Sequence, residues 1–246
     1  MGHIDVIDER AFENPVLIEG FPGVGLVGKI VADHLVEALE MDHYANVFCD
    51  ALPSAAAYGG GDRAIRTPVR LYAAPDADLL VLQSDVPVSP AAAEEFAGCI
   101  DGWFREESVL PLYIAGLRRE GDAADHPSLR GIGVGVGKDV LSQVNIPSPE
   151  APGLVSGPTG ALLAHAMETN LDAVGLVVDA DPQFPDPAAA RIVLEGAVEP
   201  ITELDVDANA LDAQASRIQD AKERLAAQMR DADENASQAR PLRMYQ

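Results

Sequence analysis

Short apolar runs alternate with segments of helical period along most of the chain. An apolar run over 15–19 is followed by a segment, 26–40, whose apolar positions recur at steps of three and four residues. Because strands that alternate with helices tend to pair in parallel, the pattern predicts an α/β fold with a mostly parallel sheet and helices on both faces. Further strands are expected at 47–49, 69–74, 79–83, 112–115, 132–136, 154–155 and 173–178. Further helices are expected at 90–106, 138–144, 159–168 and 187–201.

The turn after the first predicted strand reads GFPGVGLVGKI. Gly23, Gly25 and Gly28 match the dinucleotide-binding pattern G-x-G-x-x-G, and the stretch from Gly23 to Lys29 nearly completes a P-loop. Ile30 stands where a P-loop needs a Ser or Thr hydroxyl for its magnesium ion, which argues against nucleotide hydrolysis. The dinucleotide pattern remains open, as does a purely structural role in which the glycines let the chain reverse tightly.

Candidate enzyme chemistry is confined to a few carboxylates near the ends of predicted strands. Asp50 follows the second apolar run, about where a dinucleotide-binding fold keeps its ribose-binding acid. Asp85, Asp179 and Asp181 also follow apolar runs, where α/β enzymes often hold acids. The histidines match no zinc-binding motif, so we expect no metal site. The serines match no nucleophile elbow. One alternative is therefore a small-molecule α/β enzyme that binds a nucleotide or nucleoside, with the turn Gly23–Gly28 as its anion site.

Charge excludes two classes of partner. The 246 residues include 40 acidic and 17 basic side chains, a formal net charge of −23, which repels nucleic acid and anionic membrane surfaces. The acids are spread along the whole chain, and nearly all the basic residues are arginine. We interpret this distribution as adaptation to a saline cytoplasm, where salt screens the self-repulsion, and an ordinary acidic cytosolic protein is the alternative. Cys49 and Cys99 are too few for a disulfide framework, and the chain start lacks an apolar signal region, so a cytoplasmic protein is expected.

A second glycine-rich stretch, GIGVGVG over 131–137, alternates glycine with apolar residues. Alternate residues of a strand face the same side, so these glycines leave one side open to a close neighbour. We favour a packed helix or backbone as that neighbour, and a bound ligand is the alternative.

The composition changes near residue 205. Leu211, Ile218 and Leu225 recur every seven residues, which predicts a helix over 205–230 that packs on its own domain or on a partner's equivalent helix. Residues 231–246 lose this periodicity and contain Pro241, so a flexible tail is expected there. The predicted organisation is an α/β domain over 1–204, the heptad-patterned helix and the tail.

Several segments, taken in order, resemble the PAC2 family of proteasome assembly chaperone 2-like proteins of archaea and actinobacteria. They are VLIEGFPGVGLVGKIVADHL, DLLVLQSDVPVSP, GLVSGPTGALLAHA and DADPQFPDPAAARIVLEGAVEPITELDVDANAL, which together span about 15–211. The resemblance implies a three-layer α/β/α sandwich similar to the phosphorylase/hydrolase-like fold. It also implies that Gly23, Gly25 and Gly28 are turn and packing glycines, so that no cofactor is expected.

The resemblance shifts attention to the end of the chain. A C-terminal motif of a hydrophobic residue, tyrosine and any residue anchors proteasome activators and some of these chaperones, and here the chain ends Met244-Tyr245-Gln246. The implied function is that of a non-enzymatic, proteasome assembly chaperone-like or proteasome-binding protein. It would dock these three residues on α-subunits of the core particle. The resemblance further implies a homo-oligomer.

Overall fold

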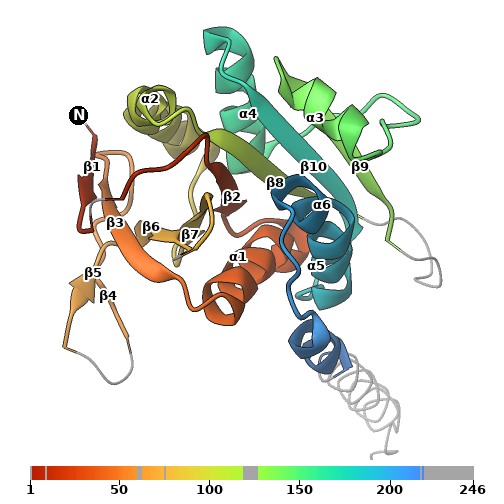
Figure 1. Ribbon diagram of the computed structural model, residues 1–246, viewed down its shortest axis with the longest axis horizontal. Helices are drawn as coiled ribbons and strands as arrows, with labels where there is room; N and C mark the ends of the chain where they lie inside the picture. The colour runs from red at the N-terminus through yellow and green to blue at the C-terminus, as the bar shows by residue number, and fades with distance from the viewer. Residues whose placement is uncertain are drawn as a thin grey trace, which may run out of the picture.

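The computed structural model describes residues 2–8, 10–59, 63–74, 76–118, 127–216 and 218. In this part of the chain, eight strands form one sheet in the order β1-β3-β6-β7-β2-β8-β10-β9, and two form a separate hairpin (Figure 1). The strands of the sheet are β1 (His3–Val6), β2 (Val16–Gly20), β3 (Asp42–Phe48), β6 (Val69–Ala73), β7 (Leu79–Ser84), β8 (Leu110–Arg118), β9 (Leu129–Val134) and β10 (Ala173–Ala180). The hairpin consists of β4 (Ala57–Tyr58) and β5 (Ile65–Arg66).

Helices cover both faces of this sheet, which gives three α/β/α layers as expected. On one face, α1 (Val27–Ala38) packs on β2, β7 and β8, and α5 (Pro187–Val193) packs beside α1 and on β10. On the other face, α2 (Pro90–Glu106) and α4 (Gly157–Thr169) pack against each other. The shorter helical elements are η1 (Val24–Leu26), α3 (Gly137–Gln143), the π turn η2 (Leu194–Val198) and α6 (Glu199–Thr202).

The sheet is mixed, so the prediction of a mostly parallel sheet is wrong. Parallel pairing is found at the centre, in β7–β2, β2–β8 and β8–β10. The pairs β1–β3, β3–β6, β6–β7 and β10–β9 are antiparallel. A strand can return in parallel only through a crossover of a dozen or more residues, and the turn between β6 and β7 is far shorter. It therefore closes an antiparallel hairpin.

Strands β2 and β7 are buried on both sides. Leu17, Leu80 and Leu82 point into the core beneath α2 and α4, whereas Ile18 and Val81 point into the core beneath α1 and α5. All five side chains are at most 1% exposed. A strand that is covered on both faces needs apolar residues at successive positions, which is why both strands are visible in the sequence as continuous apolar runs.

The structure confirms some of the other predicted elements and contradicts others. α2 begins at Pro90 with Ser89 as its N-cap, as the sequence indicates, and the Ser89 hydroxyl accepts a hydrogen bond from the amide of Ala92. Residues 154–155 form no strand and lie in the loop before α4. The helix predicted over 187–201 is divided into α5, η2 and α6.

The glycine-rich stretch over 131–137 packs against protein, as we favoured. α3 lies directly on β9, and a Cβ atom at Gly133 would come within 2.9 Å of the Gly137 backbone. Close approach of a helix therefore explains this pattern.

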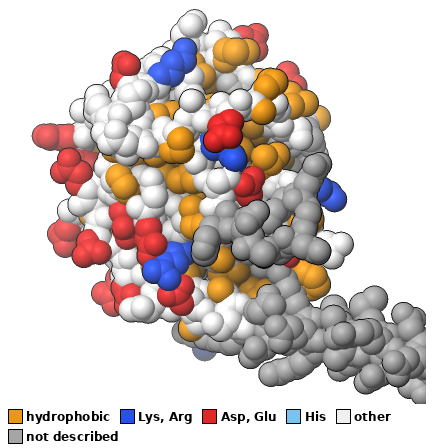
Figure 2. All heavy atoms as spheres, turned by 90° about the vertical axis from the view of Figure 1, so that its right-hand side faces the viewer, with side chains coloured by type: hydrophobic (Ala, Val, Ile, Leu, Met, Phe, Trp, Pro, Cys, Tyr) orange, Lys and Arg blue, Asp and Glu red, His pale blue; other side chains and the backbone are white. Residues whose placement is uncertain are grey.

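Acidic side chains are scattered over the molecular face shown in Figure 2, and the basic side chains there are isolated. Among the described residues, no helix is both long and apolar enough to cross a membrane.

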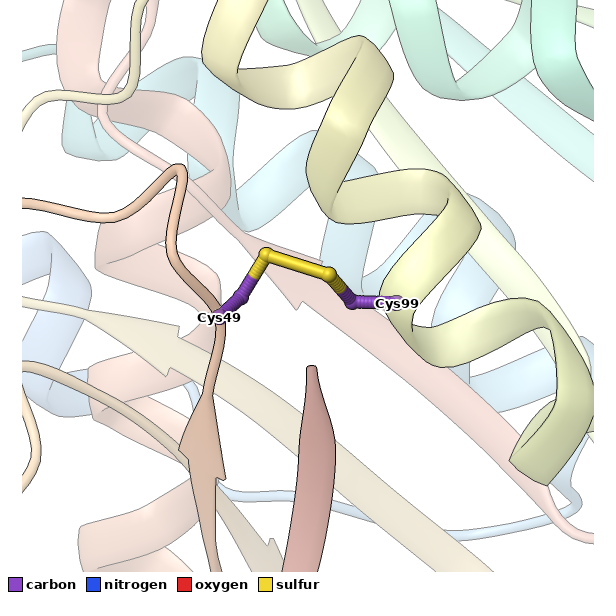
Figure 3. Close-up of a disulfide and its surroundings, with 2 residues drawn as sticks. All are labelled: Cys49 and Cys99. Atoms are coloured by element: carbon purple, nitrogen blue, oxygen red, sulfur yellow. A yellow bond between two sulfur atoms is a disulfide. The ribbon is translucent and has the colours of Figure 1, made fainter. Parts of the chain in front are cut away.

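A disulfide joins Cys49, which follows β3, to Cys99 in α2 (Figure 3). Two cysteines are too few for a framework, but they are enough for this single link. It ties the outer part of the sheet to the helix layer. Sequence spacing alone did not predict the pairing.

The first turns of the predicted C-terminal helix belong to the folded body. Residues 209–216 are helical, and Leu211 is only 2% exposed in the core shared with α1 and α5. Ile218 is partly buried, and Leu225 lies outside the described residues. The first residue of the heptad stripe, Leu211, therefore makes an intramolecular contact.

Candidate functional site

The carboxyl ends of β2 and β7 are the place where an α/β fold of this kind would hold a ligand. β2 and β7 are parallel neighbours, and the helices that follow them, α1 and α2, pack on opposite faces of the sheet. Strands whose following helices diverge in this way leave a crevice at their carboxyl ends, and open α/β sheets bind ligands there. The glycine turn and Asp85 both lie at this end.

Two glycines of the turn are required by backbone conformation or close packing. Gly25 has φ of +65°, and a Cβ atom there would lie 2.9 Å from the Cβ of Ala180. At Gly28, a Cβ atom would lie 3.0 Å from the carbonyl oxygen of Glu19. Gly25 therefore allows a left-handed turn against β10, and Gly28 lets α1 approach β2. Among the described residues, no atom lies within 4 Å of a Cβ built at Gly23.

Lys29, the cation of the glycine-rich turn, is already paired with carboxylates. The Nζ of Lys29 lies 3.0 Å from Oδ1 of Asp33 and 3.6 Å from Oδ1 of Asp85. Asp85 also accepts a hydrogen bond of 2.5 Å from Arg70, and Arg70 donates another of 2.5 Å to Gln83. Gln83 in turn donates to Asp33 over 2.7 Å. This network links α1 and β6 to the carboxyl end of β7.

The network opposes anion binding by the turn. A phosphate beside Lys29 would approach Asp33 and Asp85 as well, and these two carboxylates already balance the charges of Lys29 and Arg70. The described geometry therefore favours the packing role of the glycines over the anion-site alternative.

The remaining candidate acids lie apart from one another. Asp50 follows β3, which is separated from β2 by β7 and β6, so it cannot serve as the ribose-binding acid next to the turn. Asp179 and Asp181 lie at the end of β10, which is separated from β7 by β2 and β8. Asp179 accepts hydrogen bonds from Ser128, and Asp181 accepts from the backbone of the following loop. Asp50 and Asp85 therefore lie at other strands than Asp179 and Asp181, whereas the backbone oxygen of Asp181 lies 3.3 Å from a Cβ built at Gly25 of the turn.

Glu19, at the end of β2, is a buried carboxyl group that sequence reasoning missed. Its side chain is 0% exposed. Oε1 accepts a hydrogen bond from the Phe21 amide at 2.8 Å, and Oε2 accepts from the Ile114 amide at 3.2 Å and the Thr159 hydroxyl at 3.3 Å. Burial raises the pKa of Glu19 to about 7, although the hydrogen bonds oppose this shift. Glu19 thus ties together β2, β8 and α4.

Two hollows open at the opposite end of the sheet. One, of about 280 Å³, is lined by Phe12, Glu13, Asn14, Glu106, Glu107 and Ser108. The other, of about 230 Å³, is lined by Arg10, Ala11, Phe12, Ala74, Asp76, Ala77 and Asp78. Carboxylates outnumber cations in both linings, so neither hollow suits a phosphate or a nucleotide. Within the described residues, no cluster of three His, Cys, Asp or Glu side chains could hold a metal ion.

Comparison with known families identifies the relatives of this fold. The PAC2 family model matches residues 17–226, most of the chain. The chain belongs to the PAC2 family. Among curated proteins, an uncharacterized protein of Methanocaldococcus jannaschii is 28% identical over 218 residues, which cover 88% of this chain and 87% of the relative.

Solved structures of PAC2 relatives have the same fold. PbaA of Pyrococcus furiosus, described as an archaeal homolog of proteasome-assembly chaperone, has a TM-score of 0.77 and 26% identity over 95% of each chain. PbaB of the same organism, described as an archaeal proteasome activator, has a TM-score of 0.77 and 20% identity over 92% of this chain and 98% of its own. At that identity, PbaB shows only the shared fold.

The partner-binding residues predicted for this PAC2 protein, Met244, Tyr245 and Gln246, lie outside the described residues. For the functional residues within the fold, the sequence signals were weaker than for the chain end. Glu19 stands as a lone acid in an apolar run before glycine, which could have marked it as a buried carboxyl group. Arg70 and Gln83 are buried polar residues within their strands, but no sequence pattern pairs them.

Proposed function

We propose that this PAC2 protein binds the proteasome core particle and acts there as an assembly chaperone-like or accessory factor. The observation that carries the proposal is the similarity to PbaA, a homolog of proteasome-assembly chaperone, over 95% of both chains. The paired state of Lys29 supports a binding role over the small-molecule alternative. The folded body then serves as a scaffold instead of a catalytic centre.

The docking element in this proposal is the chain end, Met244-Tyr245-Gln246. Tyr245 would bury its ring in a pocket between neighbouring α-subunits while its hydroxyl keeps a hydrogen bond, and Met244 would fill adjacent apolar space. A cation of the α-subunit would capture the terminal carboxylate of Gln246. The net charge of the chain, −23, makes a cationic partner surface favourable at long range.

A single tail of three residues binds weakly, because ordering it costs conformational entropy. We therefore propose a homo-oligomer that presents several tails to the α-ring at once. Multivalent attachment raises the apparent affinity by about 100-fold or more through effective concentration, provided that the tails reach several pockets together.

Removal of residues 244–246 tests the tail directly. The truncated protein should lose co-purification with its cognate core particle, and Tyr245→Ala should weaken binding by about 10- to 100-fold, because a buried aromatic contributes about 1.5–3 kcal/mol. Tyr245→Phe should retain most of the affinity. Addition of one glycine after Gln246 should abolish binding, because it moves the carboxylate.

Each variant must keep the unfolding midpoint and the oligomer mass of the parent chain. If the truncated protein retains those properties and still binds the core particle as tightly as the full chain, the tail is not the anchor. Loss of binding by a variant that is also unfolded would be traced to the body, and Tyr245→Phe and Tyr245→Ala then decide the role of the ring.

A further inference from the structure

One half of a sheet face has no helix layer. On the side of α1 and α5, helices pack on β2, β7, β8 and β10. The outer strands β1 and β3 lie beyond this cover, and α2 packs near β1 on the opposite face. On β6, by contrast, Arg70 is buried in the network with Gln83 and Asp85. Within the described residues, we call the α1 side of β1 and β3 the open face.

Register places aromatic and polar side chains on the open face. Phe48 pairs with His3, and Asn46 pairs with Asp5 on one side and with Arg70 on the other. The rings of His3 and Phe48 stack with centroids 5.0 Å apart. Phe48 nevertheless remains 42% exposed at this edge of the sheet. The open face thus combines an accessible aromatic pair with the acid Asp5.

The hairpin of β4 and β5, which we call the arm, projects beside this face. Figure 1 shows the arm extending from the body next to β3, away from α1 and α5. Tyr58 and Ile65 are cross-strand partners in it, and they are 86% and 75% exposed. Arg63 leads into β5 and is exposed as well. Such large apolar side chains, held on a projecting two-stranded element, are typical of a binding surface.

The arm and the open face complement each other. The arm offers Tyr58 and Ile65 beside the cation of Arg63, whereas the open face offers Phe48 and His3 beside the anion of Asp5. The segment 57–66 carries two arginines, Arg63 and Arg66, and one acid, Asp62, which is an unusual balance in a chain with 40 acidic and 17 basic residues. Tyr58 and Ile65 are exposed, so these two side chains do not pack on the body of their own copy. A second copy of this chain would supply a matching acidic and aromatic surface.

We propose that the arm of one copy docks on the open face of a second copy, while the second arm docks reciprocally across a two-fold axis. An isologous interface requires one surface that contains both complementary halves, and the arm and the open face provide them side by side. Within the described residues, β1 is an edge strand of the sheet, so the backbone groups on its outer side can pair with incoming strands of the arm. The inference rests on the proposed self-association and is independent of proteasome binding.

Sedimentation velocity of the full chain at high salt and micromolar concentration tests the interface. Tyr58→Glu and Ile65→Glu should each weaken self-association by about 30-fold or more, as expected for a central aromatic or aliphatic contact. The matched control is Leu154→Glu, because Leu154 is 88% exposed but lies on the loop before α4. The control should keep the wild-type mass.

A photo-crosslinking amino acid in place of Tyr58 gives a second, independent measurement. Its cross-links should join two copies and map to residues 3–6 or 42–48. Cross-links that map elsewhere would overturn the proposal. An unchanged sedimenting mass in both arm variants would also overturn the proposed arm contact, while leaving the proposed self-association intact. A wild-type chain that sediments as a 25.9 kDa monomer would overturn the arm contact and the proposed oligomer together, without bearing on a single tail's binding to the core particle.

Discussion

Gly25 and Gly23 stand two residues apart in the turn before α1, yet their surroundings differ. Gly25 has φ of +65° and meets Ala180, whereas Gly23 has φ of −132° and open space around a built Cβ atom. Gly25→Ala should therefore lower the free energy of unfolding by about 1–3 kcal/mol, because a side chain is strained in the left-handed region and crowded here. Gly23→Ala should change it by less than about 0.5 kcal/mol.

Urea denaturation of the two variants measures this difference. Both glycines occupy matching positions of the apparent phosphate-binding pattern, so the comparison separates packing from ligand binding. Equal losses of stability in the two variants would contradict the packing explanation.

Glu19 makes stability depend on pH. Its folded-state pKa of about 7 lies above the ordinary value of 4.5, so between these values the folded state binds more protons than the unfolded state. The contribution of Glu19 is therefore fully present below pH 4.5 and is lost as pH rises through 7. The loss amounts to roughly 3 kcal/mol, since one pKa unit corresponds to about 1.4 kcal/mol.

Glu19→Gln removes this titration. Unfolding free energies of the parent and the variant, measured by denaturant from pH 4.5 to pH 8, should diverge as the pH rises, with the parent losing more. The difference between the two proteins isolates Glu19 from other titrating groups. Parallel curves over this range would mean that the pKa of Glu19 is not raised.

At the scale of elements, strong local signals predicted much of the fold. α2 follows its Ser-Pro start, and β2 and β7 follow continuous apolar runs. β1, β4 and β5 were missed because they are short and partly polar, so their stability comes from the strands beside them. The run at 154–155 is apolar, yet the strand predicted there does not form. The run lies between Pro152 and Pro158, and Leu154 remains exposed.

Irregularities within elements have local causes that periodicity does not reveal. The helix predicted over 187–201 contains the π turn η2, and α6 follows it with Pro200 near its start. Proline lacks an amide hydrogen and cannot donate to the carbonyl four residues earlier, so the regular ladder is interrupted there. The apolar stripe survives, because Val193, Leu194 and Val198 all remain in the core.

The candidate site was only partly predictable. The sequence placed the glycine turn between β2 and α1, as the structure has it. The pairing of Lys29 with Asp85 depends on β2 and β7 being neighbours, and that depends on strand order, which no local pattern specifies. Asp50 was misplaced for the same reason, since its strand lies three positions from β2.

At the scale of the whole molecule, charge opposes compactness. A net charge of −23 on a 25.9 kDa chain creates mutual repulsion that unfolding relieves, because the charges then lie further apart. Salt screens exposed charges over about 10 Å at 0.1 M and about 3 Å at 1 M, so it removes most of this repulsion. Stability should therefore rise steeply with sodium chloride.

The thermal midpoint of the full chain, measured from 0.05 to 2 M sodium chloride, tests this prediction. A gain of about 2 kcal/mol would raise the midpoint by roughly 4–8 °C in a protein of this size. Salt also strengthens apolar burial, so a second variant is needed to separate the two effects. Glu94→Gln, Glu95→Gln, Glu150→Gln and Glu168→Gln together remove four exposed charges. If repulsion is the cause, this variant is more stable at low salt and gains less from added salt. Equal salt dependence in the two proteins would assign the gain to apolar burial and would contradict the electrostatic explanation.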